Sequence, residues 1–262
     1  MTSFGLSSEK KSNLTQAEQE HSIADAQYAD KQGDRWTFVA VLPDTGFIHT
    51  VHHGKRTSEQ AGKFLAKIKQ KSNGKAPLFI SDAWFYENVL YETYCHYQPR
   101  PYCGRGRPPG PQRIVDKELK YAQVYKKKDS KGRLLEVVTR IIRGDKQEIM
   151  AIITKNGRSK TINTSFVESR NGKYRKDNAR LNRKTMCHSK RTKYHDAHID
   201  ILTAIFNYCR PNKALKELIN PDAKLFETKY KHKSPAMAEG LIDKILTIKE
   251  LLCWRPPKVS IL

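Results

Sequence analysis

The feature that most restricts the possible folds is the apolar run WTFVAVL at residues 36–42, which is rich in the β-branched and aromatic residues that favour strands. The next residues, PDTG, have the composition of a tight turn. The segment FIHTVHH that follows alternates apolar and polar residues, as a returning strand does. The pattern predicts a β-hairpin from about residue 36 to residue 53.

A helix and a third strand are predicted after the hairpin. Thr57 and Gln60 have the spacing of a capping box, and apolar residues at helical spacing continue to about residue 70. The run LFIS is too short for a helix and predicts a strand with Asp82 at its carboxyl end, followed by a helix at residues 84–94. This alternation indicates an α/β fold, in which functional residues lie at strand ends. Asp82 is therefore a candidate site residue, with the alternative that it only forms a turn.

Residues 98–160 combine a loop-rich stretch with strand-like segments. Residues 98–113 are rich in Pro, Gly and Arg, and we expect them to lack regular structure. Within them, GRGRP is similar to the core of an AT-hook, whose extended backbone lays two arginines, here Arg105 and Arg107, in a narrow minor groove of DNA. Residues 121–127 and 134–142 predict a second hairpin, and residues 149–154 predict another strand.

The segment TINTSFVESRNGKYRKDNARLNRKTMCHSKR, residues 161–191, predicts a helix that begins near Ser165. Three polar residues can each cap its start: Asn163, Thr164 and Ser165. An apolar stripe recurs at seven-residue spacing: Val167, Tyr174 and Leu181. Basic residues fall on the opposite side: Lys173, Lys176, Arg180 and Arg183.

Glu168 lies in the first turn of this helix, three residues before Asn171 and seven before Arg175. A carboxylate beside a basic face is suited to hold a metal ion next to a phosphodiester. The alternative is structural, because the helix macrodipole alone favours an acid at this place.

Positive charge is concentrated around this helix. Residues 155–193 contain thirteen Lys and Arg against two acidic residues, a net charge of +11, which is half of the +22 carried by the 262-residue chain. Together with a pI near 9.8, this predicts a polyanionic partner, and nucleic acid is favoured over a membrane surface. Such binding should depend strongly on salt.

The remaining segments predict helices around one main domain. Residues 1–34 are polar and mixed in charge, which indicates an N-terminal arm. Residues 194–208 and 233–252 predict amphipathic helices of a domain that covers residues 35–252, and residues 253–262 form a tail. No apolar run reaches about 20 residues, no signal peptide is evident, and five unevenly spaced cysteines favour a reducing cytosol. We therefore expect a cytoplasmic protein without a membrane span.

Seven segments, taken in order, resemble the DDE transposases of small bacterial and archaeal insertion sequences. They are WTFVAVLPDTGFI, GKRTSEQA, PLFISDAW, INTSFVESRN, RLNRKTMCHSK, NYCRPNKAL and SPAMAEGLIDKILTIKELL, from about Trp36 to Leu252. The most specific part of the resemblance is the string SFVE at residues 165–168. Asn171 follows three residues after the glutamate, and the triplets RKT and HSK come after it. The resemblance implies an RNase H-like, three-layer α/β fold with a mixed sheet, an insertion at about residues 98–160 and C-terminal helices.

The resemblance also implies a chemistry and a set of site residues. In that family, two aspartates and one glutamate hold two divalent ions, Mg²⁺ or Mn²⁺, for in-line phosphoryl displacement on DNA. By position, Asp82 resembles the second aspartate and Glu168 the glutamate. The implied activity is DNA transposition at insertion-sequence ends, by a homodimer near the prokaryotic nucleoid. Nine residues would contact DNA: Arg105, Arg107, Asn171, Lys173, Arg175, Lys176, Arg180, Arg183 and Lys184.

The first aspartate of the triad has two candidate origins. MTSFGLSSEKKSNLT resembles the segment that directly follows this aspartate in the family, so we expect an N-terminally truncated chain in which Met1 lies just downstream of it. The same truncation would remove the family's zinc-binding and helix-turn-helix region. The alternative is Asp25, although its context ADAQYAD has no strand-like flank.

Two of three carboxylates would bind metal poorly, which leaves a second hypothesis open. It is a catalytically inactive remnant of a transposase that keeps the scaffold and the basic surface and binds DNA without any need for a divalent ion. An RNase H-like nuclease of another lineage is a third hypothesis, but it leaves the transposase-like C-terminal segment unexplained.

Overall fold

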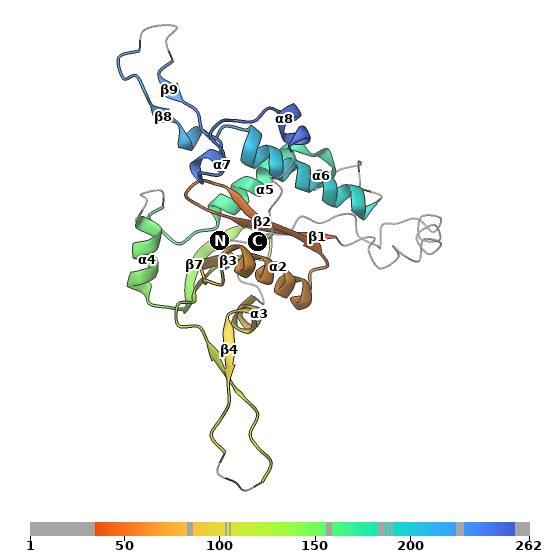
Figure 1. Ribbon diagram of the computed structural model, residues 1–262, viewed down its shortest axis with the longest axis vertical. Helices are drawn as coiled ribbons and strands as arrows, with labels where there is room; N and C mark the ends of the chain where they lie inside the picture. Colours follow the sequence, from red (N-terminus) through yellow and green to blue (C-terminus); the bar gives the residue numbers. More distant parts are fainter. Residues whose placement is uncertain are drawn as a thin grey trace, which may run out of the picture. The chain divides into compact units, whose positions relative to one another are not determined.

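The computed structural model describes residues 35–82, 86–102, 104, 106–155, 159–182, 187, 189, 191–223 and 228–254. This part of the chain is a mixed α/β protein with small sheets and several helices (Figure 1). It divides into two compact units. The first comprises Met1–Val41 and His49–Thr192, and the second comprises Leu42–Ile48 and Lys193–Leu262.

The first unit contains most of the predicted hairpin, which is confirmed. Strand β1 (Trp36–Val41) pairs with β2 (Ile48–Gly54) in a two-stranded sheet. The turn between them is closed by the Leu42 amide, which donates to the Phe47 carbonyl at 2.8 Å, and Gly46 supplies the positive φ of 69° that the turn requires. Five of the six β1 residues are buried, so both faces of this strand are covered.

Helix α2 (Ser58–Lys71) covers one face of the hairpin, and in Figure 1 α5 lies on the other side. The four buried residues of α2 are those that the helical spacing predicts: Ala61, Phe64, Leu65 and Ile68. Phe64 packs on Phe38 of β1 with ring centroids 5.6 Å apart. Only half of the predicted capping box forms. Thr57 accepts from the Gln60 amide, whereas the Gln60 side chain lies 2.9 Å from Nε2 of His52.

A three-stranded mixed sheet carries the candidate site. Its order is β3 (Leu78–Asp82), β6 (Lys120–Lys128) and β7 (Leu134–Arg143), with β3 parallel to β6 and β6 antiparallel to β7. The strand predicted at LFIS and the second hairpin are thus confirmed. A small core lies against this sheet and includes Ala122, Val124, Ile149 and Ile162.

The insertion between β3 and β6 forms a projecting arm. Helix α3 (Tyr86–Thr93), which confirms the helix predicted at residues 84–94, leads into β4 (Cys95–Gln98), which pairs antiparallel with β5 (Gln112–Val115). The described residues between these two strands are exposed and have no regular structure, as predicted, and Figure 1 shows the arm extending from α3. The four-residue strands at its base were not predicted.

The strand predicted at residues 149–154 is wrong, because the segment is helix α4 (Lys146–Thr154). Asp145 fixes its start, since Oδ2 accepts hydrogen bonds from the amides of Gln147 and Glu148 at 2.7 and 3.1 Å. Ile149 is fully buried and Ile153, four residues later on the same face, packs against its core cluster, whereas Ile152 is exposed.

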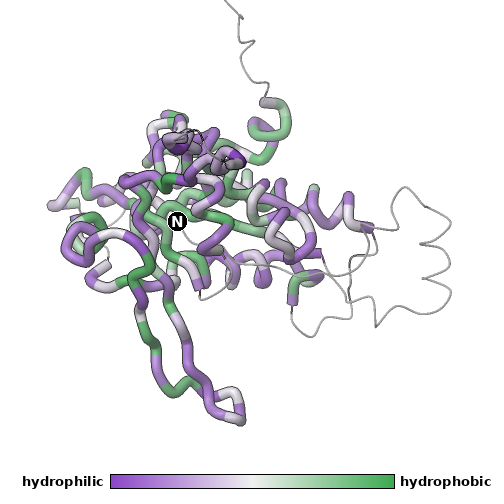
Figure 2. Tube along the Cα trace, turned by 90° about the horizontal axis from the view of Figure 1, so that it is seen from below, coloured by the Kyte–Doolittle hydropathy of each residue, from purple (hydrophilic) through white to green (hydrophobic). Residues whose placement is uncertain are grey.

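The second unit is mainly helical. Helix α6 (Thr192–Ala204) continues into a π-helical turn, η4 (Ile205–Cys209), and ends before Pro211, as predicted. Short elements follow: η5 (Lys213–Leu215), β8 (Glu217–Leu218), β9 (Tyr230–Lys231), α7 (Pro235–Ala238) and α8 (Ile248–Cys253). Figure 2 shows hydrophobic and hydrophilic stretches alternating along the trace. Of the helices that the structure describes, none is long and apolar enough to cross a membrane.

Candidate metal and nucleic-acid site

Asp82 is the last residue of β3, at the carboxyl end of the strand, as the sequence predicts. In the parallel pairing with β6 it lies opposite Val124. Its side chain is partly buried, and its Oδ1 atom is shielded from solvent and has no hydrogen-bond partner in the part of the chain that the structure describes. A buried carboxylate oxygen without a hydrogen-bond donor is unfavourable unless a cation or a donor group of a ligand binds to it.

Glu168 reaches the same place from α5 (Ser165–Asp177), a helix that begins where the sequence predicts. Its Oε1 accepts a hydrogen bond from the ammonium group of Lys126 on β6 and another, at 3.1 Å, from the Thr164 hydroxyl. Thr164 is the N-cap residue by position, but its side chain makes no cap hydrogen bond. The hydroxyl that could cap α5 therefore holds Glu168 instead.

The electrostatics show that the two carboxylates share one environment. Burial raises the pKa of Asp82, and although Lys126 opposes this shift, the negative charge of Glu168 adds to it. Burial alone would raise the pKa of Glu168 as well, but the hydrogen bonds from Lys126 and Thr164 and the charge of Lys126 bring it below its ordinary value. Glu168 is thus the more readily ionised of the pair.

Asn171 lies one helical turn after Glu168 and is 1% exposed. Neither its Nδ2 nor its Oδ1 has a hydrogen-bond partner among the described residues. Most buried side-chain amides are paired, so an amide that is buried and unpaired one helical turn from Glu168 is a candidate ligand-binding group. This agrees with the position that the sequence suggests for Asn171 near the site.

The continuous basic helix face predicted around Glu168 is wrong, because α5 ends at Asp177. Asn178 then begins a separate 3₁₀ turn, η3 (Ala179–Leu181), by accepting from the Arg180 amide at 3.0 Å. Lys173 and Lys176 are exposed on α5, and Arg175 is partly buried. Arg180 is exposed on the 3₁₀ turn, while Arg183 and Lys184 lie outside the described residues. The apolar stripe is confirmed as buried, although its third member, Leu181, belongs to the 3₁₀ turn.

The arm holds the other predicted DNA contacts. Arg107 is exposed, and Arg105 lies outside the described residues. Gly104 and Gly106 have positive φ angles of 86° and 83°, and the Tyr102 hydroxyl donates to the Gly106 carbonyl at 2.5 Å, which folds the tip of the arm back on itself. A tip with two positive φ angles departs from the uniformly extended backbone of an AT-hook.

The oxygen atoms of Asp82, Glu168 and Asn171 are of the kind that Mg²⁺ and Mn²⁺ prefer. They fit part of a metal site, because two of them are buried without partners. The described residues contain no group of three or more His, Cys, Asp or Glu side chains placed to hold a metal ion. Asp25, the candidate third carboxylate, lies outside the described part of the chain.

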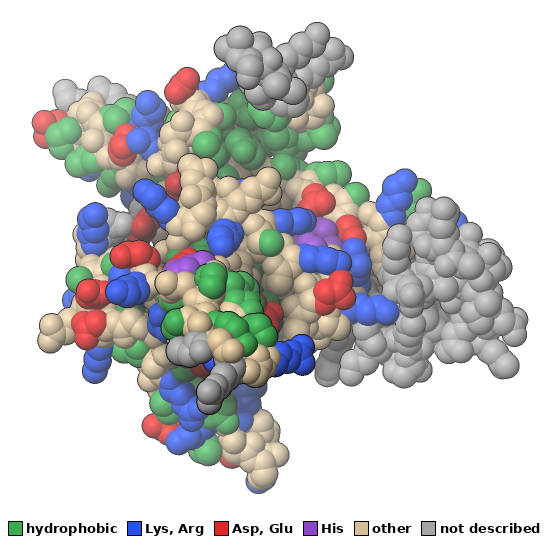
Figure 3. All heavy atoms as spheres, turned by 60° about the horizontal axis from the view of Figure 1, so that its bottom comes forward, with side chains coloured by type: hydrophobic (Ala, Val, Ile, Leu, Met, Phe, Trp, Pro, Cys, Tyr) green, Lys and Arg blue, Asp and Glu red, His purple; other side chains and the backbone are tan. Residues whose placement is uncertain are grey.

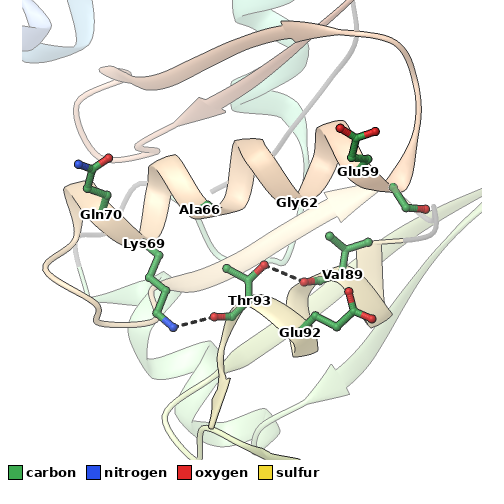
Figure 4. Close-up of a pocket in the computed structure, with 9 residues that line it drawn as sticks. Glu59, Gly62, Ala66, Lys69, Gln70, Val89, Glu92 and Thr93 are labelled. Atoms are coloured by element: carbon green, nitrogen blue, oxygen red, sulfur yellow. Dashed lines mark hydrogen bonds between the residues drawn. The ribbon is translucent and has the colours of Figure 1, made fainter. Parts of the chain in front are cut away.

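A separate cleft of about 550 Å³ lies between α2 and α3 (Figure 4). Lys69 crosses it to donate to the Thr93 carbonyl at 2.7 Å, and Glu59 and Glu92 stand at its edges. Neither Asp82 nor Glu168 lines this cleft, so its lining gives no support to phosphoryl-transfer chemistry.

Lys126 is the functional candidate that sequence reasoning missed. It stands two residues beyond Val124 on β6, so its side chain points to the same face of the sheet as Asp82. The only signal in the sequence is a lysine at the end of an apolar strand, YAQVYKKK. Figure 3 shows Lys and Arg interspersed with Asp and Glu on the face in view, so a basic residue is not distinctive by itself.

No family model, no curated protein and no solved structure matches this chain.

Proposed function

We propose that this chain is the catalytic part of a DDE-type transposase, which cuts and joins DNA strands at the ends of a mobile element with the help of Mg²⁺ or Mn²⁺. The observation that carries the proposal is the meeting of Asp82 and Glu168 around Lys126. These carboxylates are 86 positions apart in the sequence, and the sequence resemblance selects the same two as metal ligands.

The order of the elements supports an RNase H-like fold for the first unit. A hairpin is followed by a helix, a strand that ends in an acid, a parallel strand and a helix that carries the glutamate. Helices lie on both sides of the hairpin, which agrees with the three-layer arrangement that the resemblance implies. In this proposal β6, although it lies within residues 98–160, is a strand of the core, and the insertion consists of the arm and β7.

Each part of the site has a role in this proposal. Asp82 and Glu168 hold the ion, and the buried amide of Asn171 orients a phosphate oxygen or the ion itself. The flanking backbone is bound by the exposed Lys173, Lys176 and Arg180 and by the partly buried Arg175. A bound divalent ion would stabilise the charge that develops on oxygen during the in-line displacement. The second DNA end and a second copy of the chain complete the proposed assembly.

The inactive DNA-binding protein remains the second candidate function. It is favoured by the finding that only two carboxylates meet among the described residues, where the resemblance implies three. The net charge of +22 would support DNA binding in either case.

A binding measurement with a fluorescent DNA duplex separates the two candidates. We expect the affinity of the wild-type protein to increase when Mn²⁺ replaces EDTA, and we expect this increase to disappear in Asp82→Asn and Glu168→Gln. The matched control is Glu136→Gln, which removes an exposed carboxylate of β7. Equal affinity in Mn²⁺ and EDTA for all four proteins would instead support the inactive DNA-binding protein.

A further inference from the structure

Lys126 approaches the carboxylate pair from the strand next to Asp82. Its ammonium group contacts Oε1 of Glu168, and two thirds of its side chain are shielded from solvent. The same charge acts on Asp82, which makes Lys126 the shared counter-ion of both acids. The contact is local to the first unit and joins β6 and α5.

An ammonium group and a divalent ion compete for such a position. Both bind to carboxylate oxygens and would occupy the same position. Two cations a few ångströms apart also repel each other strongly in a partly buried site. Glu168 Oε1 already accepts hydrogen bonds from Lys126 and Thr164, so an ion that binds this oxygen must displace at least one of them.

We propose that Lys126 fills the cation position of the Asp82–Glu168 pair in the metal-free protein, and that a divalent ion binds by displacing its ammonium group. The displaced ammonium is then free to bind a phosphate of the DNA backbone. This inference rests on the proposed function, since it assumes that the pair is a metal site.

The inference links metal and DNA binding. A phosphate that takes up the displaced ammonium lowers the cost of displacing it, so DNA should increase the affinity for the ion, and the ion should increase the affinity for DNA by the same factor. Lys126 is in this view a positioning residue that makes the site bind metal well only when DNA is present.

The neighbouring lysine provides a matched control. Lys127 forms an exposed ion pair with Glu136 of β7 at 2.8 Å, on the opposite face of the strand from Lys126. Lys127→Met therefore removes one charge from the same strand without touching the carboxylate pair. Lys126→Arg, which keeps the charge, controls for the loss of a long side chain.

The test is a calorimetric titration of the full chain with Mn²⁺, with and without a DNA duplex. We expect Lys126→Met to bind Mn²⁺ at least about fivefold more tightly than the wild type without DNA. Lys127→Met and Lys126→Arg should bind like the wild type. Added DNA should tighten Mn²⁺ binding by the wild type and have much less effect on Lys126→Met.

Two results would overturn the inference about Lys126, and only one of them would also overturn the proposed metal-dependent function. If Lys126→Met and the wild type bind Mn²⁺ equally well, Lys126 does not compete with the ion, but the proposed metal site stands. If neither protein binds Mn²⁺, the inference and the metal-dependent function both fail. Circular dichroism on each variant shows that it is folded before the titration is interpreted.

Discussion

The side-chain amide of Asn207 binds both backbone groups of Ile48, which lies 159 residues earlier in the chain. Its Oδ1 accepts from the Ile48 amide and its Nδ2 donates to the Ile48 carbonyl, both at 2.9 Å, and Asn207 is 3% exposed. This pair of hydrogen bonds attaches the first residue of β2 to η4 within the second unit.

Asn207→Ala should therefore destabilise the protein strongly. It leaves a buried amide and a buried carbonyl without partners, which costs about 2 to 4 kcal/mol in free energy of unfolding. Urea denaturation measures the loss. Asn182→Ala, at an exposed asparagine, is the control and should have little effect. Equal stability of the two variants would show that the amide bridge contributes nothing.

Asn171 and Asn178 should respond in opposite ways to the same substitution. Asn171→Leu removes a buried amide that has no partner among the described residues and should raise the free energy of unfolding by about 1 kcal/mol. Asn178→Leu removes the cap of η3 and should lower it by about 1 kcal/mol. The two are compared by thermal unfolding without DNA or metal. A loss of stability in Asn171→Leu would mean that its amide has a structural role.

The arm should contribute to DNA affinity through charge. Replacing its exposed arginines, Arg100, Arg107 and Arg113, by Ala should weaken DNA binding and reduce the slope of log affinity against log salt by about 0.9 for each lost phosphate contact. Binding is measured at several salt concentrations. The control replaces three exposed lysines of the second unit, Lys213, Lys231 and Lys249, and changes the net charge equally. The same slope for both triple variants would exclude specific contacts by the arm.

Glu250 should titrate far below an ordinary glutamate. The hydrogen bond from Lys244, together with those from the Thr247 amide and hydroxyl in the capping box of α8, lowers its pKa to about 2. Because the folded-state pKa lies below the ordinary 4.5, this carboxylate stabilises α8 above pH 4.5, and the contribution is lost as the pH falls toward 2.

A carbon NMR titration of Glu250 measures this pKa directly. Lys244→Met should move the midpoint upward toward 4.5, because the hydrogen bond from Lys244 is the main cause of the shift. An unchanged midpoint in that variant would contradict the assignment.

Local signals in the sequence were sufficient for much of the fold. The turn PDTG identified the first hairpin, Thr57 identified the start of α2, and the short run LFIS identified β3 with Asp82 at its end. Short apolar runs are ambiguous without such a signal. The run EIMAIIT fits a strand or a helix equally well, and its helical structure depends on the Asp145 cap that precedes it.

The set of residues that form the site depends on long-range contacts, which cannot be predicted from any local sequence pattern. The charge of Lys126 acts on Asp82 only because β3 and β6 pair in parallel with Asp82 opposite Val124. That register is set by the packing of the whole unit. The basic helix face was predicted wrongly for a related reason. The periodicity continued through Arg180, but Asn178 can bond to the backbone two residues ahead and so ends the helix.

The most direct test of the proposed metal site is to map the cuts that Fe²⁺ makes in the protein backbone in the presence of ascorbate, since Fe²⁺ can replace Mg²⁺ and generates radicals where it binds. The account predicts cuts close to Asp82 and Glu168 that excess Mg²⁺ suppresses and that are lost in the double variant Asp82→Asn, Glu168→Gln. Cuts that persist in the double variant, or none near these two residues, would contradict it.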